Sequence, residues 1–176
     1  MGGLGSEDRK RSRLLVLDVD HTLLYAPAYD PLLEVVSGAS MTRKAFFDAL
    51  PAGGVTIQVG RPELVYPRPH LATFIQDAKA MGYDLGICTT ATLDYIELLL
   101  PLCGVELSLF SVVVTREDLS RSGGKLVKNL HRFSEFGYSL DDVVAIDDRE
   151  DIHQHTENLL TIKPFNISRD DFREDK

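Results

Sequence analysis

The sequence predicts a single α/β domain in which a parallel sheet is covered by helices on both faces. Two observations carry this prediction. Short, continuous apolar runs are typical of strands buried on both faces, and they alternate along the chain with segments whose apolar residues recur every three or four positions. Strands that alternate with helices favour a parallel sheet. The 176 residues are enough for one domain with a sizeable core.

Five apolar runs are the candidate strands, and three amphipathic segments are the candidate helices. The runs span residues 14–17, 85–88, 112–114, 143–146 and 159–162. The helical segments span residues 71–78, 93–100 and 126–133, and they end at Gly82, at Pro101 with Gly104, and at Gly137.

The segment 25–66 interrupts this alternation. It contains a short helical pattern over residues 42–50, a turn at residues 51–54, and two strand-like pieces near residues 55–59 and 63–66. We interpret it as a small insertion, partly a β-hairpin, at the mouth of the sheet. The domain itself is expected to span residues 13–167, between a disordered, Gly-rich leader at 1–12 and a charged tail at 168–176.

Composition excludes several classes of protein. The net charge of −8 argues against nucleic-acid binding through a basic face. No run of about 18 apolar residues predicts a membrane span, and the N-terminal residues lack the apolar core of a secretory signal. Cys88 and Cys103 lie in apolar stretches, where buried free thiols are expected. These features favour a cytoplasmic protein, or a nuclear one in a eukaryote, and leave the oligomeric state open.

Two acids follow the first predicted strand directly, at Asp18 and Asp20. In an open parallel sheet, ligands bind beyond the carboxyl ends of the strands. Two carboxylates placed there repel each other unless a cation or a function holds them together. A turn at the strand end explains one Asp but not two, so the pair predicts a functional site.

The residues DVDHT at positions 18–22 resemble the DxDxT motif of the haloacid-dehalogenase (HAD) phosphatases. In that family the first Asp attacks phosphorus and becomes an aspartyl-phosphate, and the second protonates the leaving group and then activates water. The resemblance therefore implies that Asp18 is the nucleophile and that Asp20 is the general acid and base.

Further motifs follow in the order of the same family. Thr89 ends the strand-like run 85–88 and resembles the hydroxyl that binds a phosphate oxygen, with Thr90 as its neighbour. Lys128 resembles the lysine that neutralises the phosphate and the nucleophile, with Lys125 as a nearby rival.

A second pair of acids, Asp147 and Asp148, follows the run 143–146 and resembles the last motif of the family. The resemblance implies that this pair completes a Mg²⁺ site with the Asp18 carboxylate and the backbone carbonyl of Asp20. The Asp20 side chain then stays free for proton transfer.

A closer resemblance is to the phosphatases that act on the C-terminal domain of RNA polymerase II, a family that includes the NLI-interacting-factor-like proteins. It covers roughly residues 13–165 and is carried by LDVDHTLL at 17–24, YPRP at 66–69 and VKNL at 127–130. The resemblance implies that Thr22, Thr90 and Arg68 bind substrate. The chain departs from the family pattern at His21 and Asn129, where acids are usual.

Neither gap between the motifs holds a full cap domain, because about 40 residues separate Tyr25 from Tyr66 and 38 separate Thr89 from Lys128. An open cleft favours a phosphoprotein substrate, whose own chain can cover the site. Two alternatives stay open. One is a small-metabolite phosphatase, and the other is a catalytically silent binding module, since the mitochondrial presequence receptor shares this fold family.

Other motifs are incomplete. Gly124-Lys125 is followed by Leu126 and is not a phosphate-binding P-loop, and neither cysteine is followed by an arginine at the spacing of cysteine-dependent phosphatases. The pair His153 and His155 predicts a solvated loop rather than a metal site, because so short a pair is weak evidence for a metal.

Overall fold

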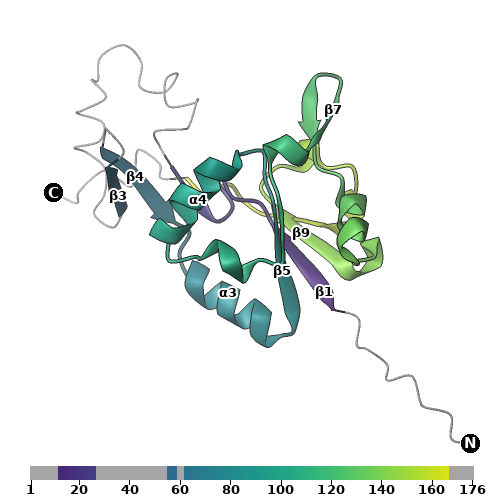
Figure 1. Cartoon of the computed structure of the whole chain (residues 1–176), viewed down its shortest axis with the longest axis horizontal. Helices are drawn as coiled ribbons and strands as arrows, with labels where there is room; N and C mark the ends of the chain where they lie inside the picture. The colour runs from purple at the N-terminus through teal and green to yellow at the C-terminus, as the bar shows by residue number, and fades with distance from the viewer. Residues whose placement is uncertain (1–11, 27–54, 59–61, 167–176) are drawn as a thin grey trace, which may run out of the picture.

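The computed structural model describes residues 12–26, 55–58 and 62–166. At its centre lies a five-stranded sheet of order β10-β9-β1-β5-β6, in which every neighbouring pair is parallel (Figure 1). The strands are β1 (Arg13–Leu17), β5 (Tyr83–Cys88), β6 (Val112–Val114), β9 (Val143–Asp147) and β10 (Leu159–Thr161). All five predicted strands are confirmed. Because β1 is central, the ends of β5 and β9 flank its carboxyl end.

One face of the sheet is covered by two α-helices, α3 (Leu71–Ala80) and α4 (Leu93–Leu102), which lie on the same side in Figure 1. Leu15 and Leu17 of β1 share one buried cluster with Ile75 of α3 and Leu99 of α4. Both helices agree with the prediction. Gly82 follows α3 with a φ of 83°, a backbone conformation that favours glycine.

The opposite face is covered by a 3₁₀ helix, η4 (Leu130–Phe136), rather than by an α-helix. Leu130 and Phe133 pack there against Leu14 and Val16 of β1. The predicted helix over 126–133 is therefore wrong in its first part.

Residues 125–127 instead form β8 (Lys125–Val127), which pairs antiparallel with β7 (Ser120–Ser122). The helical part begins only after Asn129, whose side chain accepts a hydrogen bond from the backbone N–H of His131. The other 3₁₀ helices are η2 (Leu107–Leu109), η3 (Arg116–Asp118), η5 (Leu140–Asp142), η6 (Glu150–Ile152) and η7 (Thr156–Asn158).

The described part of the insertion forms a small antiparallel sheet of order β2-β4-β3, as its strand-like pattern predicts. Its strands are β2 (Leu24–Tyr25), β3 (Val55–Gln58) and β4 (Pro62–Pro67). The predicted helix at 42–50, the leader through residue 11 and the tail from residue 168 lie outside the described residues. Among the described residues, no helix is both long and apolar enough to cross a bilayer.

Candidate active site

A buried lysine joins the acids that follow two neighbouring strands. Asp18 follows β1 and Asp147 ends β9, and the two strands pair in parallel register. The Lys128 Nζ lies 2.6 Å from Asp18 Oδ1 and 2.5 Å from Asp147 Oδ2. All three side chains are buried, and that of Lys128 is 1% exposed. The ammonium is therefore fixed between two carboxylates that lie 129 positions apart in the sequence.

Negative charge exceeds positive charge at this point of the fold. Carboxylate oxygens of Asp18, Asp147 and Asp148 lie within 4.8 Å of one another, in an arrangement that could hold a metal ion. Burial raises the pKa of Asp18 to about 7, although the Lys128 ammonium opposes that rise. Burial and the Asp147 carboxylate also raise the pKa of Asp148. One ammonium does not balance three carboxylates, so the cluster is suited to a cation.

The two acids of the second pair differ in how fully they are occupied. Asp147 Oδ2 accepts hydrogen bonds from Lys128 and from His153, and its Oδ1 accepts from the Arg149 backbone N–H at 2.8 Å. Asp148 is half-buried, and among the described residues its side chain has only a long contact of 3.4 Å with the Thr22 hydroxyl. Asp148 therefore has more capacity left for a ligand than Asp147.

Asp20 lies outside the acid cluster, as the resemblance implies for a residue whose side chain moves a proton. Its Oδ1 accepts a hydrogen bond of 2.5 Å from the Tyr95 hydroxyl of α4. Burial raises the pKa of Asp20, whereas the Tyr95 hydrogen bond lowers it and limits that rise. A half-buried carboxyl group with a raised pKa is suited to acid and base catalysis.

Thr89 is fully buried where β5 ends, and its backbone N–H donates to the Val114 carbonyl of β6. Its hydroxyl oxygen accepts from the Ala91 backbone N–H at 3.1 Å, which leaves the hydroxyl hydrogen free to donate. Thr90 is half-buried, and its carbonyl accepts from the Arg116 guanidinium at 2.7 Å. Of the two candidate hydroxyls, Thr89 is the one fixed at the end of a central strand.

The comparisons with known proteins agree with this site. A model of the NLI interacting factor-like phosphatases matches residues 13–175. The chain belongs to this family. The family is one of phosphatases, which are phosphoric monoester hydrolases, and its HAD-type fold is the one predicted above.

A human relative of this family member is a phosphatase of the C-terminal domain of RNA polymerase II, which is 27% identical over 170 residues. That alignment covers 92% of this chain and 16% of the human protein. The chain therefore spans about a sixth of the relative that it matches.

Two solved structures share the fold. The fission yeast RNA polymerase II CTD phosphatase Fcp1, bound to beryllium fluoride, is 23% identical with a TM-score of 0.56, over 88% of this chain and 42% of that one. A putative β-phosphoglucomutase from Thermotoga maritima is 11% identical with a TM-score of 0.55, over 89% of this chain and 88% of that one. At these identities the likeness shows the fold alone.

Arg68 of this NLI interacting factor-like phosphatase contacts backbone atoms at the site's edge. Its guanidinium donates to the carbonyls of Thr22, His21 and Lys163 at 2.6, 2.8 and 2.8 Å, and it lies over the Phe165 ring. These bonds tie the loop after β1 to the segment after β10. His21 adopts a φ of 58°, and the bonds to its carbonyl help to hold that strained loop.

Sequence reasoning missed His153. The prediction of a solvated loop is wrong for this residue, because its side chain is 1% exposed and its Nε2 lies 2.8 Å from Asp147 Oδ2. His155 is 18% exposed and contacts the Asn129 side chain at 3.2 Å. No local signal separates the two histidines, since the backbone pairing of His153 with Lys128 decides which ring is buried.

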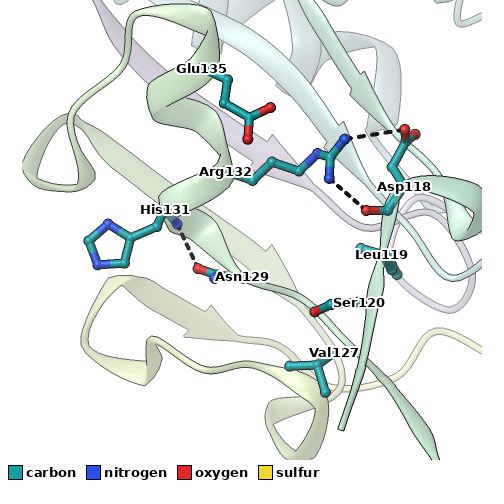
Figure 2. Close-up of a pocket in the computed structure, with 8 residues that line it drawn as sticks. All are labelled: Asp118, Leu119, Ser120, Val127, Asn129, His131, Arg132 and Glu135. Atoms are coloured by element: carbon teal, nitrogen blue, oxygen red, sulfur yellow. Dashed lines mark hydrogen bonds and ion pairs between the residues drawn. The ribbon is translucent and has the colours of Figure 1, made fainter.

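A separate pocket of about 270 Å³ lies between the start of the β7–β8 hairpin and η4 (Figure 2). Arg132 donates across it to the carbonyl and the carboxylate of Asp118. Asn129 lines this pocket and directly follows Lys128 in the chain. None of the acids at the strand ends lines it, so the pocket is distinct from the acid cluster.

Proposed function

We propose that this NLI interacting factor-like phosphatase hydrolyses phosphate monoesters through a covalent intermediate on Asp18, and that its substrates are phosphoproteins. The observation that carries the proposal is the state of the Asp18 carboxylate. Its Oδ1 is held by Lys128, and its Oδ2 has no hydrogen-bond partner among the described residues. One oxygen is therefore anchored while the other is available to attack phosphorus.

Two steps complete the reaction. Asp18 Oδ2 attacks the phosphorus, the bond from phosphorus to the ester oxygen breaks, and that oxygen takes a proton from Asp20. Water then attacks the phosphorus of the aspartyl-phosphate and gives a proton to Asp20, which releases phosphate and restores Asp18. Lys128 and the Thr89 hydroxyl donate to phosphoryl oxygens as charge develops on them.

The acid cluster fits a magnesium ion, because it offers hard oxygen ligands and an excess of negative charge. Asp18 and Asp148 would hold the ion with the backbone carbonyl of Asp20, and Asp147 lies next to them. Bound there, the ion would neutralise charge on the phosphoryl oxygens and orient the phosphoryl group. Asp147 would contribute mainly by holding Lys128, since its oxygens already accept hydrogen bonds.

Two observations support a protein substrate. The human relative is named as a phosphatase of the C-terminal domain of RNA polymerase II. Between Thr89 and Lys128, the described chain forms only α4, η2, β6, η3 and the β7–β8 hairpin, with no separate cap domain. A phosphoprotein can supply the binding energy that a cap supplies elsewhere. The cytoplasm or the nucleus is the corresponding compartment.

A substrate panel tests this proposal. The protein is assayed with Mg²⁺ on phosphoserine, phosphothreonine and phosphotyrosine peptides beside sugar phosphates and nucleotides. We expect kcat/KM for the best peptide to exceed that for the best metabolite at least about tenfold, or about 1.4 kcal/mol of transition-state binding. A metabolite that is hydrolysed faster than every peptide would contradict the protein substrate and favour a metabolite phosphatase.

The insertion offers a second test of the substrate class. Residues 51–61 are replaced by a short turn, while the buried Val65 and the pairing of β4 with β2 are kept. If the insertion contacts a protein substrate, peptide hydrolysis falls more than hydrolysis of a small aryl phosphate. An equal loss on both substrates would show that the insertion does not bind the peptide.

A further inference from the structure

His153 has no part in the proposed reaction, yet its ring lies among the charged residues of that reaction. Its Nε2 is 2.8 Å from Asp147 Oδ2, and a carboxylate oxygen accepts, so Nε2 is the donor. The other ring nitrogen, Nδ1, is buried and has no hydrogen-bond partner in the part of the chain that the structure describes. A buried polar atom without a partner is unfavourable. Within that part of the chain, Asp147 is thus the contact that compensates for placing a polar ring here.

The backbone places His153 directly beside Lys128. The Lys128 N–H donates to the Ile152 carbonyl at 2.8 Å, and the Gln154 N–H donates to the Lys128 carbonyl at 3.1 Å. These two bonds form a parallel bridge between Lys128 and His153, beyond the end of β8. Both side chains consequently reach the same oxygen, Asp147 Oδ2.

We infer that His153 is a positioning residue, which holds the Asp147 carboxylate so that Asp147 in turn holds the Lys128 ammonium against Asp18. The contacts run from His153 to Asp147 at 2.8 Å, from Asp147 to Lys128 at 2.5 Å, and from Lys128 to Asp18 at 2.6 Å. This inference rests on the proposed roles of Asp18 and Lys128.

The expected effect of His153 is on kcat more than on KM. Lys128 neutralises charge that develops on the phosphoryl group, so its exact place matters most in the transition state. Outer hydrogen-bond partners that orient the residues of a charged site typically change activity by about 10–100-fold. A displaced Lys128 therefore lowers kcat, while ground-state binding of the substrate changes less.

Two substitutions separate the hydrogen bond from the shape of the ring. His153→Phe keeps an aromatic ring but removes the donor, and His153→Gln keeps an N–H donor near the position of Nε2. His155→Phe is the matched control, since His155 lies on the same segment but contacts Asn129 instead of an acid of the site. For each variant, kcat and KM are measured on an aryl phosphate with saturating Mg²⁺, and thermal unfolding confirms that the variant is folded.

We expect His153→Phe to lower kcat by about tenfold or more with KM changed less than about threefold. His153→Gln should retain kcat within about threefold of the wild type, and His155→Phe should match the wild type. Wild-type kcat in folded His153→Phe would overturn the inference. So would an equal loss in His153→Gln and His153→Phe, because the ring's shape and not its donor would then matter.

A second readout does not depend on turnover. In ¹⁵N-histidine-labelled protein, the inference requires a solvent-protected Nε2–H resonance that disappears in His153→Phe and persists in His155→Phe. Absence of this resonance overturns the inference whatever the activity. If the resonance is present but the wild type hydrolyses no phosphate ester, the proposed function fails, and the placement of His153 against Asp147 stands.

Discussion

Lys128 is buried together with two carboxylates, and this combination is unstable unless each charge has a partner. Burial alone would lower the pKa of Lys128, but the carboxylates of Asp18 and Asp147 raise it overall and keep the ammonium charged. The same ammonium does not fully compensate Asp18, whose pKa burial raises to about 7. At the residue scale, the site therefore holds Lys128 charged and leaves Asp18 in need of a second cation.

Asp18→Asn tests the proposed nucleophile. The substitution keeps the size of the side chain but replaces the attacking oxygen by an amide, so kcat should fall at least about 10²-fold while the protein stays folded. Turnover is measured on an aryl phosphate with Mg²⁺, and circular dichroism checks the fold. Activity above a few per cent of the wild type in cleanly purified protein would exclude Asp18 as the nucleophile.

The same variant tests the electrostatics of the metal-free site. The pKa of Asp18 is about 7 in the folded chain against 3.8 for an unperturbed Asp side chain, so its charge destabilises the folded state increasingly from about pH 4 to pH 7. One pKa unit corresponds to about 1.4 kcal/mol, and relaxation of the site reduces the net effect. In EDTA, Asp18→Asn should be more stable than the wild type by about 1–3 kcal/mol at pH 8. The difference should vanish near pH 4, and a difference that does not depend on pH would contradict it.

Tyr95→Phe tests the proposed acid and base. Burial raises the pKa of Asp20 and the Tyr95 hydroxyl lowers it, so removal of the hydroxyl raises that pKa further. The first step needs protonated Asp20, and kcat/KM therefore falls as the pH rises through the pKa of Asp20. The falling limb of the kcat/KM profile should move to higher pH in Tyr95→Phe.

Asp20→Asn is the companion variant for this profile. It should lower both formation and hydrolysis of the phosphoenzyme by roughly 10²-fold or more and remove the limb. A limb that stays in place in Tyr95→Phe, or that persists in Asp20→Asn, would assign the titration to another group.

At the scale of elements, the β7–β8 hairpin leads directly into Lys128. Its turn residues Gly123 and Gly124 have φ values of 58° and 82°, and two positive φ values are typical of a tight hairpin turn. A Cβ at Gly124 would meet no atom within 4 Å, so a substitution there changes only the backbone preference.

Gly124→Ala should accordingly destabilise the protein by about 1 kcal/mol, because a left-handed backbone disfavours a residue with a Cβ. Gly123→Asn is the matched variant, since Asn adopts this conformation more readily than Ala, and it should cost less. Urea unfolding measures both. An equal or larger loss for Gly123→Asn would show that the turn is not the origin of the effect.

At the scale of the whole molecule, the acid cluster predicts that a cation stabilises the fold. A ligand that binds only the folded state stabilises it by about 2.7 kcal/mol at 100 times its Kd. Mg²⁺ should therefore raise Tm, and Asp148→Asn should remove most of that rise because its carboxylate is the least occupied of the cluster. Asp151→Asn is the control, since Asp151 is exposed and pairs with Arg149. A Tm rise as large in Asp148→Asn as in Asp151→Asn would place the ion elsewhere.

The sequence by itself determined the sheet and the acids at its edge. A strand buried on both faces needs a continuous apolar run, so the runs before Asp18, Thr89 and Asp147 could be found locally. In a parallel sheet the carboxyl ends of strands share one edge, and the order of the motifs therefore implied that these side chains come together.

Only the tertiary structure decided the surroundings of those side chains. Apolar spacing at 126–133 fits a helix, yet a turn and strand pairing make its first part β8, because pairing with β7 outweighs local preference. The partners of Arg68 at the loop after β1, and of His153 at Asp147, depend on which segments the sheet order brings side by side. A side chain's partner across space leaves no periodic trace in the chain, since hydrogen bonds depend on distance and orientation rather than on sequence spacing.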